Sequence, residues 1–133
     1  MRYCADTWFF VETSKGNPKV MNILRNVRKG KDFLVVPSVV LLEITRETIR
    51  SGKPEIAEDI IQIMKTVRNI KIVDADMEIC SNAGKLSATH NIPAIDAIIA
   101  TTAIKHKCRV VLTADEHFDI LGRHKVVKKR TVK

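Results

Sequence analysis

The sequence predicts an α/β fold, a three-layer α/β/α sandwich around a central, mostly parallel sheet of four to five strands. Short apolar segments rich in β-branched residues alternate along the chain with longer segments of helical periodicity, which is the order of a parallel sheet covered by helices. The segments Phe33–Val36 and Val110–Leu112 are apolar throughout. Strands of this kind are typically buried on both faces, so helices are expected on both sides of the sheet.

Five short segments are expected to form the strands: Arg2–Ala5, Asp32–Pro37, Ile70–Val73, Arg109–Thr113 and Lys125–Lys128. Residues 7–30, between the first two strands, are expected to be helical with a break at Gly16-Asn17-Pro18, because glycine and proline interrupt a helix.

Four more helices are expected between the later strands, at Ser38–Arg50, Pro54–Val67, Met77–His90 and Pro93–Lys107. Ser38 is a suitable N-cap, and Pro54 and Pro93 suit the first position of a helix. The last of these helices is expected to bury Ile95, Ile98, Ile99 and Thr102 on its core face.

The size and composition of the chain indicate one globular unit. It has 133 residues, 45% of them hydrophobic, with only 5 Gly and 4 Pro. This predicts a single domain over residues 1–133 that ends in a basic segment at 123–133. Cys4, Cys80 and Cys108 form no CxxC pair, so we expect reduced thiols rather than a disulfide framework or a zinc site.

No segment is typical of a membrane or secreted protein. The longest uncharged apolar run, residues 33–42, has ten residues, whereas a membrane helix needs about 18 or more. Residues 1–6 lack the apolar core and cleavage site of a signal peptide. We therefore expect a cytoplasmic protein with no membrane partner.

The formal net charge of +8 is unevenly distributed along the chain. Residues 15–31 and 123–133 each contain six basic residues and no acid. The rest of the chain has 11 basic residues against all 15 acidic ones, a net charge of −4. The basic stretches suggest a polyanionic partner such as RNA, held by its phosphates.

Four acids are expected at the carboxyl edge of the sheet. Asp6 and Asp115 follow the first and fourth strands, Glu43 lies early in the helix after the second, and Asp96 opens the helix before the fourth. Ligands of open parallel sheets bind at this edge. Clustered carboxylates favour a hard cation, and Mg²⁺ or Mn²⁺ fits because no calcium-loop spacing occurs. Such an ion activates water for attack on a phosphodiester.

Each acid also has an ordinary structural explanation. Asp6 and Asp115 are equally suited to capping turns, and Asp96 to stabilising a helix N-terminus, although its apolar neighbours favour a functional role. Glu43 has Arg46 and Arg50 within reach on the same helix.

Histidine and threonine side chains are further candidates for the chemistry of the site. His90, His106, His117 and His124 show no ligand spacing, so we expect them in turns or at helix ends rather than in a metal site. Hydroxyls of Thr7 and Thr113 are placed to orient the neighbouring acids, with turn formation as the alternative. No nucleophile-elbow, Walker A or dinucleotide-binding glycine pattern occurs.

Four segments carry a family resemblance: Asp6-Thr7, Pro37–Glu43, Ile92–Ala100 and Val111–Asp115. In this order and spacing they resemble the PIN-domain nucleases, particularly the small stand-alone ones of the VapC toxin type. The resemblance covers essentially the whole chain and implies a three-layer α/β/α fold. The family often carries Ser or Asn two positions after the first Asp, where this chain has Trp8.

The resemblance implies that Asp6, Glu43, Asp96 and Asp115 are the catalytic acids of a Mg²⁺- or Mn²⁺-dependent endoribonuclease. Asp6, Asp96 and Asp115 would hold the metal. The resemblance also implies a homodimer and, for the toxin of a VapBC-type pair, an antitoxin that covers the acidic cleft.

Three other functions stay open from the sequence: a housekeeping RNA-processing PIN nuclease, a non-catalytic RNA- or protein-binding module on the same fold, and a receiver-type signalling domain. A receiver usually needs paired acids after the first strand, where Asp6 stands alone, although Asp74 and Asp76 follow the third. Glu116 and Asp119 lie close enough in sequence to share the role of Asp115.

Overall fold

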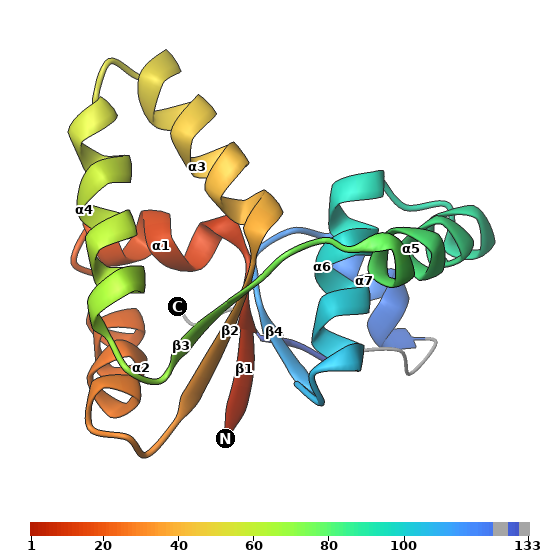
Figure 1. Cartoon of the computed structure of the whole chain (residues 1–133), viewed down its shortest axis with the longest axis horizontal. Helices are drawn as coiled ribbons and strands as arrows, with labels where there is room; N and C mark the ends of the chain where they lie inside the picture. The colour runs from red at the N-terminus through yellow and green to blue at the C-terminus, as the bar shows by residue number, and fades with distance from the viewer. Residues whose placement is uncertain (124–127, 131–133) are drawn as a thin grey trace.

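A computed structural model describes residues 1–123 and 128–130 of the chain (Figure 1). Its centre is a sheet of five strands in the order β3-β2-β1-β4-β5, and every neighbouring pair is parallel. The strands are β1 Arg2–Ala5, β2 Phe33–Pro37, β3 Ile70–Val73, β4 Val110–Leu112 and β5 Lys128–Arg130. The predicted α/β sandwich is confirmed.

Seven helices cover the sheet within the described residues: α1 Thr7–Ser14, α2 Pro18–Arg28, α3 Ser38–Arg50, α4 Pro54–Thr66, α5 Met77–His90, α6 Ala94–Lys105 and α7 His117–Arg123. In Figure 1, α1 to α4 lie on one side of the sheet and α5 to α7 on the other. This arrangement gives the three layers.

The centre of the sheet is the place where the strand order reverses. From β1 the chain crosses to β2 on one side, whereas β4 pairs with β1 on the other, with Cys4 opposite Val111 and Ala5 opposite Leu112. All four of these side chains are fully buried. The carboxyl ends of β1 and β4 therefore adjoin at a topological switch point, where ligands of such sheets bind.

The break in the first helical region is confirmed. Gly16 has φ +73°, a left-handed conformation that glycine adopts without steric cost. Asn17 then caps α2 by accepting hydrogen bonds from the backbone N–H groups of Lys19 and Val20, and Pro18 takes the first helical position. The chain thus turns sharply between α1 and α2.

Some expected details are wrong. Ser38 is not an N-cap: β2 runs directly into α3, Pro37 takes the cap position, and no side chain caps this helix. Pro93 is likewise the N-cap of α6 rather than its first helical residue. Ile95 and Ile98 are only partly buried, because α6 packs its buried face through Ala97, Ile99, Ala100, Thr101, Thr102 and Ala103.

The last part of the chain also differs. The helix α7, which the sequence analysis did not predict, is held to the core by the fully buried side chains of Phe118 and Leu121. The fifth strand lies at Lys128–Arg130, and residues 125–127 of the expected strand fall outside the described residues. In the described part of the chain, no helix is both long and apolar enough to cross a membrane.

Candidate metal centre

Asp6 lies directly after β1, where it caps α1. Its Oδ1 accepts a hydrogen bond from the backbone N–H of Thr7 at 2.7 Å, and its Oδ2 accepts one from the hydroxyl of Thr113 at 2.6 Å. The carboxylate is buried, and burial raises its pKa, although these hydrogen bonds act in the opposite direction. The capping role and a place in the acidic site are therefore compatible for this residue.

Thr113 holds two parts of the site at once. Its hydroxyl donates to Asp6 and accepts from the backbone N–H of Asp115 at 3.0 Å. The hydroxyl of Thr7 donates to Glu43 Oε1 at 3.0 Å. Both threonines thus orient acids from another element of the fold.

Glu43 comes from α3 and is half-buried. Burial raises the pKa of its carboxyl group, and the nearby charges of Asp6 and Asp115 add to this effect. The alternative of a surface ion pair is wrong, since Arg46 and Arg50 both lie against Glu47, at 3.3 and 3.7 Å. Among the described residues Glu43 thus forms no ion pair with these arginines, although the nearby charge of Arg46 acts against the rise of its pKa.

Asp96 lies in the first turn of α6 and is 8% exposed. Burial, together with the negative charges of Asp115 and Asp6, raises its pKa to about 6. Asp115 belongs to the turn before α7, where its Oδ1 accepts the backbone N–H of His117 at 2.9 Å. The turn-forming role expected as an alternative for Asp115 is thus present.

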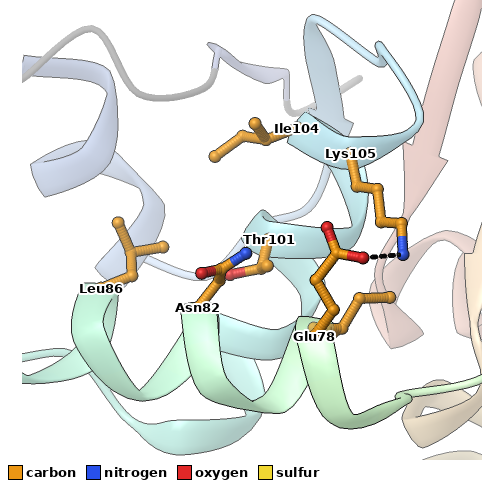
Figure 2. A pocket seen from close by; sticks show the side chains of 7 residues that line it. Glu78, Asn82, Leu86, Thr101, Ile104 and Lys105 are labelled. Carbon is orange, nitrogen blue, oxygen red and sulfur yellow. Dashed lines mark hydrogen bonds and ion pairs between the residues drawn. The ribbon is translucent and has the colours of Figure 1, made fainter.

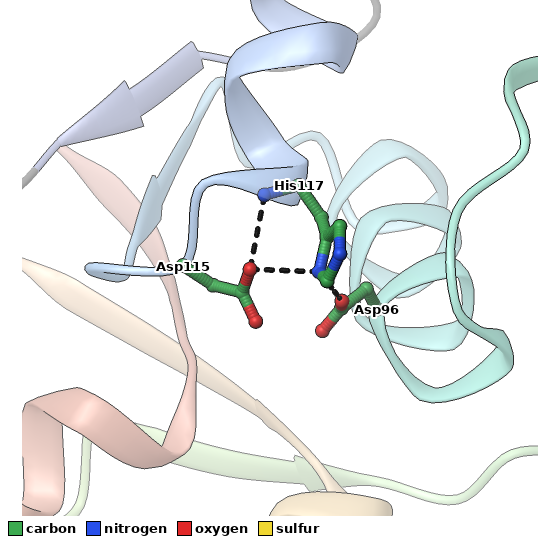
Figure 3. Close-up of side chains that lie close together, drawn as sticks. All are labelled: Asp96, Asp115 and His117. Atoms are coloured by element: carbon green, nitrogen blue, oxygen red, sulfur yellow. Dashed lines mark hydrogen bonds and ion pairs between the residues drawn. The ribbon is translucent and has the colours of Figure 1, made fainter.

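His117 is the residue that the sequence analysis missed. Its Nδ1 lies 2.9 Å from Asp96 Oδ2 and 2.8 Å from Asp115 Oδ1, so the ring stands between the two carboxylates (Figure 3). The three side chains each offer one ligand atom, and these atoms lie within 4.8 Å of one another. His117 lies at a helix end, as expected, but the sequence analysis did not anticipate its contact with two aspartates, because it looked for spacing between histidines.

The spacing Asp115-x-His117 was the available signal. In an Asx turn the aspartate side chain accepts a hydrogen bond from the backbone N–H two residues on, here that of His117. The turn at Asp115 was expected as an alternative, but without α7 in the prediction its consequence for the position of His117 was not recognised.

The donor set fits a cation. His117 Nδ1 is shielded from solvent and, among the described residues, makes no directed hydrogen bond, although two carboxylate oxygens lie within 2.9 Å. The raised pKa values of Asp6, Glu43 and Asp96 show that each of these carboxylates is held where its charge is unfavourable. A divalent ion relieves this repulsion. Asp6 lies outside the group of three and joins the centre through Thr113.

Glu116 and Asp119, which follow Asp115 in the sequence, lie in different environments from it. Glu116 is exposed, and Asp119 forms an ion pair with Lys129 of β5 at 3.2 Å. Asp119 is thus engaged on the surface.

The end of the first basic stretch lies at the opposite edge of the sheet from the acids. Lys29 and Lys31 directly precede β2, and Asp32 beside them forms an ion pair with the N-terminal ammonium of Met1 at 3.3 Å. This is the amino edge. Arg130, in the second stretch, lies at the carboxyl end of β5, where its backbone oxygen accepts from the N–H of Thr113.

A separate pocket of about 340 Å³ lies between α5 and α6. Figure 2 shows its side chains, with Glu78 and Lys105 paired at 2.9 Å at one end. Leu86, Ile104 and Thr101 also line it, and none of the four predicted acids does. The acidic centre therefore does not depend on this pocket.

The fold and this centre define a class of protein: an α/β sandwich that gathers carboxylates from four segments at the switch point of a parallel sheet. The chain belongs to the PIN domain family, whose sequence model matches residues 3–123. The family resemblance stated from the sequence is thereby confirmed. No curated protein sequence matches the chain significantly.

Several solved structures share the fold along nearly the whole chain. VapBC2 from Rickettsia felis, bound to a DNA fragment from its promoter, superposes with a TM-score of 0.75 at 20% identity and covers 98% of both chains. DNA-bound VapBC from Salmonella typhimurium gives 0.70 at 18% identity, also over 98% of both chains. VapBC-1 from nontypeable Haemophilus influenzae gives 0.67 at 21% identity with the same coverage.

Proposed function

We propose that this protein is a divalent-metal-dependent endoribonuclease that hydrolyses phosphodiester bonds in RNA. The observation that supports this most directly is the convergence of Asp6, Asp96 and Asp115, with raised pKa values at Asp6 and Asp96, on one edge of a PIN-domain sheet. A centre of this kind suits Mg²⁺ or Mn²⁺, which these three acids would hold. We propose the whole of residues 1–133 as one nuclease domain, with 123–133 as its basic segment.

The divalent ion would acidify a water molecule and neutralise charge that develops on the phosphate. The protein's own side chains would orient the acids and accept a proton from the attacking water. Thr113 fixes the direction of Asp6, and Thr7 fixes Glu43 through Oε1. Glu43 Oε2 is left to accept the proton of the attacking water, a role that a carboxylate with a raised pKa performs well.

The proposed biological role is that of the toxin in a VapBC-type pair, in the cytoplasm, as a homodimer with an antitoxin partner. Support comes from the VapBC assemblies that share this fold over 98% of their chains. A housekeeping RNA-processing nuclease is the second candidate. A small neighbouring reading frame that encodes a DNA-binding antitoxin would favour the toxin role.

The test is cleavage of single-stranded RNA with Mn²⁺, with and without EDTA. We expect EDTA, Asp6→Asn and Asp96→Asn each to abolish cleavage, whereas the exposed Asp74→Asn is the matched control that leaves it unchanged. Circular dichroism checks that each variant is folded. Full activity in both site variants, or in EDTA, would refute the proposal, and RNA binding without turnover would identify a non-catalytic module.

A further inference from the structure

The side chain of His117 points to a preference of the centre for one class of metal ion. We propose that His117 Nδ1 is a ligand of the ion held by Asp96 and Asp115, and that this nitrogen makes the centre select a first-row transition ion such as Mn²⁺ over Mg²⁺. This inference rests on the function proposed above.

The distances between the donor atoms match neighbouring ligands of one ion. Metal–nitrogen and metal–oxygen bonds of such ions are about 2.0–2.2 Å, so adjacent donors around the ion lie about 3 Å apart. Nδ1 is 2.8 Å from Asp115 Oδ1 and 2.9 Å from Asp96 Oδ2. Figure 3 shows the ring edge that carries this nitrogen directed between the two carboxylates.

The ring is held in this place by the backbone around it. His117 is the first residue of α7, and its N–H is bound by Asp115 Oδ1 at 2.9 Å. The next residue, Phe118, is fully buried and fixes the helix to the core. As a result the side chain is 39% exposed, yet its Nδ1 atom is shielded from solvent. The nitrogen is thus turned away from water and toward the acids.

The chemistry of the donors decides the selectivity. Mg²⁺ prefers oxygen ligands and keeps several waters, whereas imidazole nitrogen suits first-row transition ions such as Fe²⁺ and Zn²⁺. Mn²⁺ belongs to the same row and also accepts carboxylate oxygen, so it fits a mixed set of this kind. A centre of carboxylates alone favours neither strongly. One imidazole added to two carboxylates shifts the preference toward the transition ion.

The first experiment is calorimetric titration of the full chain with MnCl₂ and with MgCl₂. We expect His117→Ala to weaken Mn²⁺ binding by about tenfold or more and Mg²⁺ binding by less than about threefold. His117→Asn, which offers an amide oxygen in place of the nitrogen, should retain Mg²⁺ binding but lose the preference for Mn²⁺. The matched control is His106→Ala, because His106 lies at the other end of α6, about 15 Å from Asp96.

The second readout is electron spin echo modulation of bound Mn²⁺, which detects a coordinated nitrogen directly. We expect nitrogen coupling in the wild type and in His106→Ala, and its absence in His117→Ala. Equal or tighter Mn²⁺ binding by His117→Ala, without nitrogen coupling in the wild type, overturns the proposal. This outcome would show that the His117 ring contacts the two aspartates only when no metal ion is bound there.

These results also separate the inference from the proposed function. Metal-dependent RNA cleavage by a wild-type protein without nitrogen coupling defeats the ligand assignment alone. Nitrogen-coupled Mn²⁺ in a protein that cleaves no RNA defeats the nuclease function and leaves the ligand assignment standing.

Discussion

Asp96 lies on the first turn of α6, where a carboxylate gains from the helix dipole, but it is also buried beside two other acids. Burial and repulsion outweigh the dipole, since the pKa rises to about 6. Asp96 lies beside Asp115 and His117, which belong to another segment of the chain. The site is therefore defined by contacts between segments, and the residues around any one acid in the sequence were not sufficient to predict it. The order of strands and helices in the sequence predicted that the acids lie at the carboxyl edge of the sheet. The contact of Asp96 with His117 could not be predicted in this way, because it depends on the short turn from Asp115 to His117.

The raised pKa of Asp96 predicts how stability depends on pH. Its folded-state pKa of about 6 exceeds the ordinary value of 3.8, so its contribution to stability is complete below about pH 4 and is lost as the pH rises through 6. In EDTA, we expect the melting temperature to fall between pH 5 and pH 7, with a smaller fall in Asp96→Asn. Thermal unfolding at both pH values measures this.

Metal addition supplies the control for this prediction. Divalent ions bind the deprotonated carboxylates, so the rise in melting temperature on adding Mn²⁺ should be larger at pH 7 than at pH 5. An equal rise at both values would contradict the pKa assigned to Asp96.

At the scale of elements, the long periodic segments were the most predictable. The strands at Arg2–Ala5 and Ile70–Val73 and the helices at Ser38–Arg50 and Met77–His90 have the bounds expected from the sequence. Their periodic pattern predicts that each element exists and where it ends, although Leu42, Ile49 and Met77 of these helices are exposed. The seven-residue helix α7 is too short for such a pattern and exists through the packing of its buried Phe118 and Leu121.

The start of α3 shows a different limit. Ser38 has the right chemistry for a cap, but the extended Pro37 takes that position because β2 leads into the helix without a loop. Local propensity was overridden by the connection between two elements.

Asp6 serves both α1 and the acidic centre, and two substitutions separate these roles. Both Asp6→Asn and Asp6→Ala remove the charge, but only Asn can still accept the N–H of Thr7 as a helix cap. We expect Asp6→Ala to have a free energy of unfolding about 1 kcal/mol below that of Asp6→Asn. Urea unfolding in EDTA measures the difference, and equal values would show that the cap contributes nothing to stability.

For the whole molecule, the position of the charges matters more than the net charge of +8. The end of the first basic stretch lies at the amino edge, and the acids lie at the carboxyl edge. One cation near the acids is Arg46 of α3, an exposed residue whose charge acts to lower the pKa of Glu43. The basic stretches are visible in the sequence. Which of their cations can contact a phosphate at the acidic site depends on whether they lie at the carboxyl or the amino edge of the sheet, and this follows from the direction of the strands.

RNA affinity should follow this placement. We expect Arg46→Ala to weaken binding of single-stranded RNA severalfold and to reduce its salt dependence, because a phosphate contact is lost. Arg28→Ala, at the end of α2, is the matched control and should change RNA binding little. Filter binding at several salt concentrations measures both. A larger loss in Arg28→Ala than in Arg46→Ala would place the RNA on the amino edge instead.

The hydrogen bond between Thr113 and Asp6 joins residues 107 positions apart in the sequence. A connection of this range forms late in folding, because a long stretch of chain must be ordered before its ends meet. During synthesis, a ribosome-bound chain that ends before Thr113 has Asp6 and Glu43 but lacks the hydroxyl that holds Asp6 Oδ2, and it also lacks Asp115. A nuclease built in this way acquires its centre only when almost all of its chain has emerged, so interrupted translation yields inert fragments.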